Sequence, residues 1–192
     1  MEIIDSTFEN NQWTESCIFI SSAENTNLFP CYTRIAETTF KEISGTVISL
    51  DERESPVHLE LYSNKFTHNL GRAILSKHGS VIDNASTYIH NQNESDSNIT
   101  ILRGSTYTGT EITFDYNEVN NDGGAIYVSG ASIFVCDSCE FTNNKAIKGG
   151  AIYVEGDSRT EISSSTFDNN IATENGSAYY LISSKTDPKS SI

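Results

Sequence analysis

The sequence is short of basic residues and of long apolar runs, and both shortages restrict what the protein can bind. Only 12 Lys and Arg stand against 26 Asp and Glu, which gives a formal net charge of −14. This balance argues against nucleic acid and anionic membrane surfaces as partners, and leaves cations, basic proteins and neutral glycans. No run of about 18 apolar residues is present, so the sequence predicts no membrane-spanning helix.

Signals for export and for helices are missing as well. The first five residues, Met1 to Asp5, have neither the basic start nor the apolar stretch of a signal peptide. No window of 11 residues has its apolar positions at helical spacing. We therefore expect strands and turns rather than helices.

Two short motifs recur along the chain with one period. GGAIYV occurs twice, beginning at Gly123 and Gly149, and the same glycine position recurs every 26 residues at Gly45, Gly71, Ser97, Gly123 and Gly149. An aromatic residue heads the second motif, at Phe8, Phe40, Phe66, Tyr88, Phe114, Phe141 and Phe167. Asn follows three positions later at Asn11, Asn69, Asn91, Asn117, Asn144 and Asn170, with Ile43 in the remaining repeat. A shared period of this length indicates stacked supersecondary units.

The unit that repeats is too short for a strand-helix-strand crossover. About 26 residues can hold three short β-prone runs and three turns, and clusters of Gly, Asn, Asp and Ser separate such runs throughout. We therefore predict an all-β fold, a single-stranded parallel β-helix of about seven coils. The 36% content of hydrophobic residues suits a thin solenoid with a solvated outer face. One domain is expected over residues 1–184, with a loop insertion at 21–32 and a polar tail at 185–192.

The columns of the predicted solenoid have distinct roles. The seven aromatic residues should point inward and stack, and so supply much of the core. The six Asn should form a ladder at a bend, where an amide residue also tolerates the left-handed conformation. The glycines mark a bend at which a Cβ would clash. Which of Ile126 and Tyr127 faces inward stays open, because both neighbours in this strand are apolar.

The paired motifs resemble those of a known group of proteins. GGAI at Gly123–Ile126 and Gly149–Ile152, together with the Phe-x-x-Asn elements, is similar to the repeats of chlamydial polymorphic outer-membrane proteins and of similar β-helical surface proteins in protists. This resemblance is tightest in the last third of the chain. It implies a right-handed parallel β-helix that is secreted or on a cell surface, with an adhesive or structural role.

The chain opens inside a coil. Ile3 lies five residues before Phe8, as Ile35 lies before Phe40. A solenoid needs a polar capping unit at each end. We therefore expect a segment, a mature subunit, or a protomer whose open end is covered by another molecule.

Four cysteines are candidates for disulfides. Cys17 and Cys31 bracket the predicted loop, and a bond closing it is favoured over two buried thiols. Cys136 and Cys139 form a lone C-x-x-C, which has no second ligand pair for zinc and no thioredoxin-like context. A local disulfide across a bend, or two reduced thiols, is expected there.

Four sequons mark candidate glycosylation sites, at Asn84, Asn93, Asn98 and Asn175. Their number is what chance alone would give in a chain so rich in Asn, Ser and Thr. The first three cluster on a predicted outer turn, which favours their use if the source is a eukaryotic secretory cell.

The prediction for metals and cofactors is that none is bound. One alternative set, Glu42, His68 and His90, lies in a single column of successive coils and has ligand types that transition metals accept. The same column also fits a variable outer turn whose side chains face solvent.

Catalysis is not expected either. Many parallel β-helices are polysaccharide lyases or hydrolases, but this chain has no Asp-Asp pair and only scattered basic residues. We predict a non-catalytic extracellular or cell-surface module acting as scaffold, adhesin or filament subunit, within a larger glycoprotein or assembly. Its expected partners are other copies of itself, other surface proteins or glycans. A glycan-active enzyme of the pectin-lyase-like class and an acidic cation-binding module are the alternatives.

Overall fold

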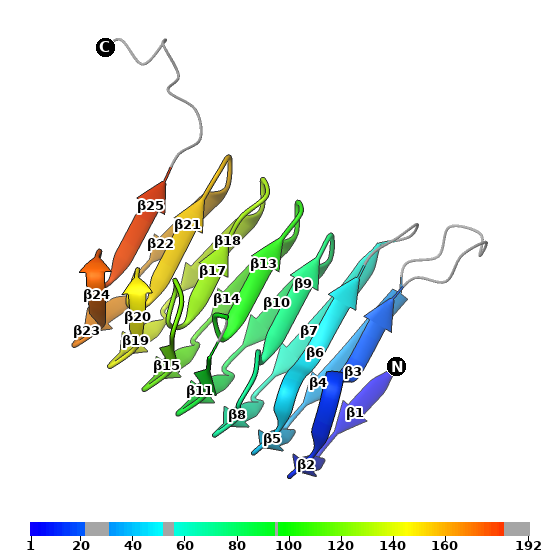
Figure 1. Cartoon of the computed structure of the whole chain (residues 1–192). Coiled ribbons are helices and arrows are strands. Elements are labelled where there is room, and N and C mark those ends of the chain that lie inside the picture. The colour runs from blue at the N-terminus through cyan, green and yellow to red at the C-terminus, as the bar shows by residue number, and fades with distance from the viewer. Residues whose placement is uncertain (22–30, 52–55, 95, 183–192) are drawn as a thin grey trace.

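The strands of this chain wind into a parallel β-helix, which confirms the predicted fold class. A computed structural model describes residues 1–21, 31–51, 56–94 and 96–182, and these residues form strands and turns with no helix (Figure 1). Strand pairing throughout is parallel, and it joins residues about one repeat apart. None of the described residues forms a helix of the length and apolarity that a membrane span requires.

Three long sheets, A, B and C, and one shorter sheet, D, run along the solenoid. Sheet A contains β1 (Glu2–Ile4), β4 (Cys31–Ala36), β7 (Val57–Tyr62), β10 (Ser80–Asn84), β14 (Thr106–Thr110), β18 (Ile133–Asp137) and β22 (Arg159–Ser163). Sheet B contains β2 (Thr7–Glu9), β5 (Thr39–Lys41), β8 (Lys65–Thr67), β11 (Thr87–Ile89), β15 (Thr113–Asp115), β19 (Glu140–Thr142) and β23 (Thr166–Asp168).

Sheet C lies toward the viewer in Figure 1. It contains β3 (Gln12–Ser21), β6 (Ser44–Asp51), β9 (Ile74–Lys77), β13 (Ile99–Leu102), β17 (Ile126–Val128), β21 (Ile152–Glu155) and β25 (Tyr179–Ile182). Sheet D contains β12 (Gln92–Asn93), β16 (Glu118–Val119), β20 (Lys145–Lys148) and β24 (Ile171–Asn175). Seven strands per long sheet correspond to about six full turns, slightly fewer than the about seven coils predicted.

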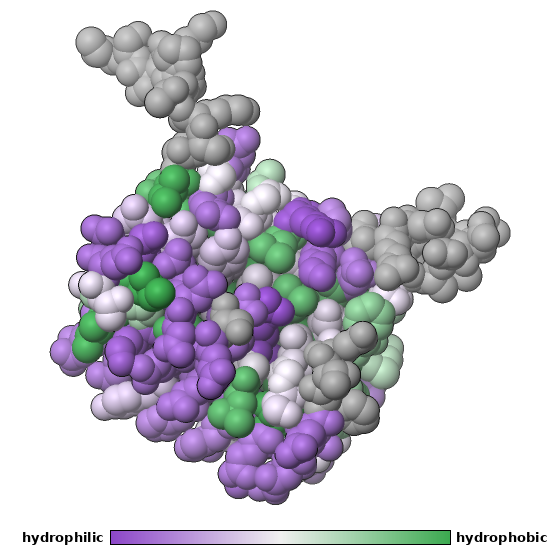
Figure 2. Space-filling model, viewed as in Figure 1, coloured by the Kyte–Doolittle hydropathy of each residue, from purple (hydrophilic) through white to green (hydrophobic). Residues whose placement is uncertain are grey.

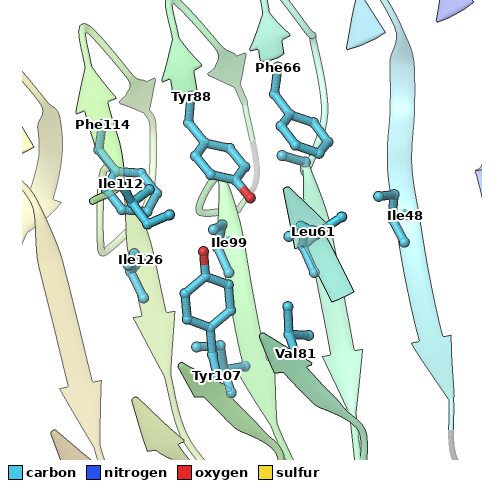
Figure 3. Packing of buried hydrophobic residues seen from close by; sticks show 14 of the residues in the cluster. Ile48, Leu61, Phe66, Val81, Tyr88, Ile99, Tyr107, Ile112, Phe114 and Ile126 are labelled. Atoms are coloured by element: carbon cyan, nitrogen blue, oxygen red, sulfur yellow. The ribbon is translucent and has the colours of Figure 1, made fainter. Parts of the chain in front are cut away.

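The aromatic residues of the second motif form one stack inside the solenoid. Adjacent ring centroids lie between 4.7 and 5.1 Å apart, close to the inter-strand spacing of about 4.8 Å. The five inner rings are fully buried, whereas Phe8 is half-buried and Phe167 in the last layer is 36% exposed. Figure 3 shows the rings of Phe66, Tyr88 and Phe114 side by side in the core.

An amide ladder runs beside this stack from Asn69 to Asn170. The Nδ2 of Asn117, for example, donates to Oδ1 of Asn144 at 2.9 Å and to the Tyr88 carbonyl at 2.9 Å. Its Oδ1 accepts from Nδ2 of Asn91 at 3.1 Å. Ile43 occupies the position between Asn11 and Asn69, and there the backbone N–H of Ile43 donates to Oδ1 of Asn69 instead. Asn11 is therefore separated from the continuous ladder by an apolar layer.

The left-handed turn residue differs from the one expected. The ladder Asn do not have positive φ. The residue immediately before the Asn position of each Phe-x-x-Asn motif does, with φ between 51° and 55°, at Asn10, Glu42, His68, His90, Tyr116, Asn143 and Asn169. The ladder amide must point inward to reach its neighbours, so the chain makes its turn one residue earlier. The predicted glycine clash does hold. A Cβ on Gly71 would lie 2.1 Å from the Gly45 carbonyl oxygen.

One polar cluster lies inside the apolar core. The carboxylate of Asp83 is fully buried, and its Oδ2 accepts from the hydroxyls of Tyr88 at 2.6 Å and Tyr107 at 2.7 Å. Figure 3 shows these two hydroxyls pointing toward each other. Gly109 pairs with Asp83 in the next coil, and a Cβ there would lie 3.1 Å from the Tyr107 ring, so the missing side chain makes room for it.

The described strands run from Glu2 to Ile182, and the domain bounds of 1–184 stay a prediction. Most of the predicted loop insertion, residues 22–30, lies outside the described residues. So does the predicted tail at 185–192.

Candidate functional site: a groove on the outer face of sheet C

A groove follows the outer face of sheet C. It consists of two hollows, of about 460 and 310 Å³, that share Arg72 and Asp96. Strand register gives the sheet an outward column with one residue per layer: Phe19, Ser49, Leu75, Thr100, Tyr127, Tyr153 and Tyr180. The first six of these residues line the floor of the groove. Figure 2 shows this side of the molecule as mostly hydrophilic, with separate hydrophobic patches.

The middle of this outward column is more deeply covered than an outer sheet face usually is. Ser49, Leu75 and Thr100 are all buried, although they point away from the core. Asn93 of β12, together with Asp96 and Ser97 before β13, lines the same hollows. These three residues therefore form one wall of the groove.

A row of stacked tyrosines occupies one end of the column. Strand alternation turns Ile126 inward, where it is fully buried, and turns Tyr127 outward, which settles the choice that the sequence left open. The rings of Tyr127 and Tyr153 are 5.3 Å apart and nearly parallel, and Tyr180 continues the row at 5.7 Å. The row ends at Tyr127, because its partner in the preceding layer is Thr100.

Each carboxylate that lines the smaller hollow already has a partner. Oε2 of Glu155 accepts from the Tyr153 hydroxyl at 3.2 Å, and Oε1 accepts a short hydrogen bond from Tyr127. Asp96 forms an ion pair of 2.5 Å with Arg72. Oδ1 of Asp122 accepts from the backbone N–H of Lys148 at 3.1 Å.

Burial and these neighbours shift several protonation equilibria. Desolvation, followed by the charge of Glu155, raises the pKa of Tyr153 to about 12. Desolvation likewise raises the pKa of Tyr127 above its usual range, and raises the pKa of the Asp122 carboxyl. Both tyrosines therefore remain neutral hydrogen-bond donors near neutral pH.

Two polar atoms in the groove lack partners among the described residues. They are the hydroxyl oxygen of Thr100, a residue only 4% exposed, and Nε of Arg72. A buried polar atom without a hydrogen bond costs about 1–3 kcal/mol. Both atoms are buried from solvent, so neither faces the open space of the groove.

The alternative metal set is not brought together. The rings of His68 and His90 stack on each other at 5.3 Å, and the ring of Tyr116 stacks on His90 at 5.0 Å. The Glu42 carboxylate lies 3.2 Å from Nζ of Lys41. Stacked rings direct their nitrogen atoms sideways rather than toward one centre. No group of three or more His, Cys, Asp or Glu in the described part of the chain is placed to hold a metal ion.

The two cysteine pairs behave differently. Cys136 and Cys139 are joined by a disulfide, with their Cα atoms 6.1 Å apart. Cys17 and Cys31 are free thiols, which corrects the disulfide favoured for them. They belong to β3 of sheet C and β4 of sheet A, and both pack against the hydrophobic core as small apolar groups.

One of the four sequons is incompatible with a glycan in the folded chain. Asn98 is 2% exposed, and its Nδ2, the atom that would carry the sugar, donates to Oδ1 of Asn117 at 3.1 Å. Asn84 and Asn93 are half-buried and Asn175 is exposed, so glycosylation stays a prediction for these three.

Sequence reasoning did not find the groove. Arg72, Asp96, Asp122 and Glu155 lie in four different repeats and belong to neither motif. The signal that was present is the 26-residue spacing of Tyr127 and Tyr153, together with Thr100 in the same column. It becomes informative only when the outward side of the strand is known.

Comparison with models of known protein families finds a similarity in two stretches of the chain. Residues 111–129 and 138–155 match the model of the Chlamydia polymorphic membrane protein repeat. The match and the β-helix together confirm the predicted resemblance, and they suggest a surface- or outer-membrane-associated repeat protein. A search of curated proteins finds no significant match.

Proposed function

We propose that this chain is a non-catalytic module of an extracellular or cell-surface protein, acting as scaffold or adhesin and contacting its ligands through the groove on sheet C. The repeat match supports the surface location. The stack and the ladder support a rigid rod, because the inner layers repeat the same ring contacts and, from Asn69 onward, the same amide contacts. Such a rod holds a row of outward side chains in fixed positions.

The state of the groove carboxylates is the observation that carries the non-catalytic assignment. Glycoside hydrolysis needs one carboxyl group to donate a proton and a second to act as base or nucleophile. In the groove, Asp96 is bound to Arg72 and Glu155 accepts from two tyrosines. Carboxylates held in this way suit recognition of a ligand better than proton transfer.

Two experiments test this proposal. Antibodies raised against the chain should label intact, unpermeabilised source cells as strongly as permeabilised ones, and label that appears only after permeabilisation would contradict a surface role. Purified chain should also release no reducing ends and no unsaturated products from pectin, xylan or β-glucan. Sustained product formation that is abolished by Glu155→Gln would show an enzyme instead.

The two end layers support association with further copies of the chain. Strands β1 to β3 at one end and β22 to β25 at the other are paired on one side only within the described residues. Apolar side chains are exposed there at Ile4, Phe167, Ile171, Leu181 and Ile182. Unpaired strand edges next to apolar side chains favour addition of strands from another molecule. A contact between two different ends does not close, so it would build a filament.

Light scattering coupled to size exclusion tests this association. The molar mass should rise with protein concentration, and Ile171→Lys should reduce the rise by placing charge in the end layer. Ile82→Lys, on the outer face of sheet A, is the matched control and should leave association unchanged. A monomer at every concentration would contradict end-to-end assembly.

A further inference from the structure

We propose that Asn175 is a site of spontaneous deamidation, at which the backbone nitrogen of Gly176 attacks the side-chain amide and a carboxylate takes its place. This modification goes beyond the proposed function and does not rest on it. Three features carry the assignment: the residue that follows Asn175, the exposure of its side chain, and the position of both residues in the last described layer.

The reaction needs only water as a co-reactant. The Gly176 nitrogen gives up its proton and forms a bond to Cγ of Asn175, and the bond from Cγ to Nδ2 breaks as ammonia leaves. The intermediate is a succinimide ring. Water then opens this ring at either carbonyl, which gives aspartate or, where the chain continues through the side-chain carboxyl group, isoaspartate. Nothing is oxidised or reduced.

The residue after Asn175 leaves the attacking nitrogen uncrowded. A side chain on that residue would hinder the approach to Cγ, and glycine has none. Asn175 is the only Asn in the sequence that precedes Gly. Asn169 and Asn170 belong to the same layer, but they precede Asn and Ile. The sequence therefore contains one favourable site.

The Asn175 side chain is exposed, unlike the amides of the inner ladder. Asn144, for comparison, is fully buried, and its Nδ2 donates to the Phe114 carbonyl and to Oδ1 of Asn170, both at 3.0 Å. Attack on such an amide would first have to break these bonds inside the core. Among the described residues, the Asn175 amide group has no hydrogen-bond partner of this kind.

The position in the last described layer leaves the attacking nitrogen free. Gly149 occupies the same column one layer inward, and its N–H donates to the Asn175 carbonyl at 3.0 Å. The N–H of Gly176 has no such acceptor within the described part of the chain. The carbonyls of Asn175 and Gly176 do accept from the layer below, which restrains the peptide group. An end layer opens locally at low cost, so this restraint is weaker than in an inner layer.

The experiment follows the purified chain in mildly alkaline buffer by peptide mapping with mass spectrometry. A bacterial host without N-glycosylation supplies the protein, because a glycan on Nδ2 of Asn175 would prevent the loss of ammonia. Aspartate and isoaspartate should appear at Asn175 in the native chain at a rate within about tenfold of the rate in urea, since opening the last layer costs little. Asn169 and Asn170 should remain unchanged.

Lys148→Asn is the matched variant, because it places the same Asn-Gly pair in the same column one layer inward. The N–H of Gly149 is hydrogen-bonded, so in the native state this site should convert at least about tenfold more slowly than Asn175 of the same molecule. In urea both sites should convert at similar rates. The lost ion pair between Lys148 and Glu174 lies at the surface and contributes little to stability.

A second variant tests the chemistry of the ring. Asn175→Gln keeps an amide at this position, but the longer side chain would have to close a larger ring. Conversion at this position should therefore be lost. Conversion at an unchanged rate would show that the Gly176 nitrogen is not the nucleophile.

Conversion adds a carboxylate next to Glu174 in the last described layer, and isoaspartate also lengthens the backbone there. Both changes oppose the addition of another layer. This consequence rests on the proposed end association, whereas the modification does not. Converted chain, separated by anion exchange, should show a lower molar mass in light scattering than unconverted chain at equal concentration. Equal molar masses of two associating forms would overturn this consequence alone.

Two results would overturn the assignment of the site. One is a native rate at Asn175 more than about tenfold below the rate in urea, which would show that the last layer holds this peptide group firmly. The other is an equal native rate at the Asn introduced by Lys148→Asn. Neither result affects the antibody labelling of intact cells, so the surface role would stand.

Discussion

Asn117 is the ladder position at which the cost of losing one amide can be worked out most fully. Its Oδ1 accepts from the backbone N–H of Asn91 at 3.3 Å, from Nδ2 of Asn91 at 3.1 Å and from Nδ2 of Asn98 at 3.1 Å. Its Nδ2 donates to the Tyr88 carbonyl and to Oδ1 of Asn144. The residue is fully buried, so water cannot replace these partners.

Asn117→Ala would remove the Oδ1 acceptor and leave two buried donors without a hydrogen-bond partner among the contacts given above. They are the backbone N–H of Asn91 and Nδ2 of Asn98, whereas Nδ2 of Asn91 keeps the Phe66 carbonyl. At about 1–3 kcal/mol for each unsatisfied group, the free energy of unfolding should fall by about 2–6 kcal/mol.

Urea unfolding followed by far-ultraviolet circular dichroism measures this loss. Asn170→Ala is the matched control, because Asn170 lies in the last layer, is only part-buried and accepts from the layer on one side. It should cost less than half as much. A loss below about 1 kcal/mol for Asn117→Ala, or an equal loss for both variants, would refute the claim that a continuous buried ladder stabilises the fold.

Two further predictions concern single buried groups. Burial raises the pKa of the Asp83 carboxyl, although hydroxyls of Ser86, Tyr88 and Tyr107 oppose the shift, so the folded chain holds this proton more tightly than the unfolded chain. The stability of the unsubstituted chain relative to Asp83→Asn should therefore be greatest below the ordinary carboxyl pKa and should decrease as pH rises through the raised pKa. The measurement is the difference in melting temperature between the two proteins at each pH. A difference that stays constant or grows with pH would contradict this prediction. Glycopeptide mapping of chain secreted from a eukaryotic host should find Asn98 unmodified, and a high occupancy there would show that the amide is accessible.

The regular part of this fold could be predicted because one period governs two motifs. Phe114 and Phe141 are 27 residues apart in sequence, and their ring centroids lie 4.9 Å apart, because each coil contains nearly the same number of residues. The inward direction of these rings follows from their size and from the polar residues beside them. The spacing of the two motifs therefore predicts the aromatic stack, the amide ladder and the glycine bend.

The groove could not be predicted, because it depends on what departs from the repeat. Tyr127 faces outward only because Ile126 takes the core position, and both side chains are apolar enough for either place. Asp96 forms a wall of the groove through a segment that replaces the glycine bend of other coils. Thr100 is important because it is small where Tyr127 and Tyr153 are large. The spacing of Tyr127 and Tyr153 follows the period, but the period does not say which side of the strand their rings face.

The thiols and the turn residue show a second limit. Cys17 and Cys31 flank one loop in sequence, yet their strands belong to different sheets. The left-handed position falls on His68 rather than Asn69, because hydrogen bonding along the ladder fixes the direction of the Asn69 side chain. Local preference is overruled in both cases by contacts between coils.

Contacts between rings in successive layers test the layered architecture most directly. In a spectrum of nuclear Overhauser effects, the ring protons of Phe114 should show strong contacts to those of both Tyr88 and Phe141, since the centroids lie 5.0 and 4.9 Å away. Assigned ring protons of Phe114 without contacts to either neighbour would contradict the β-helix, and the groove built on it.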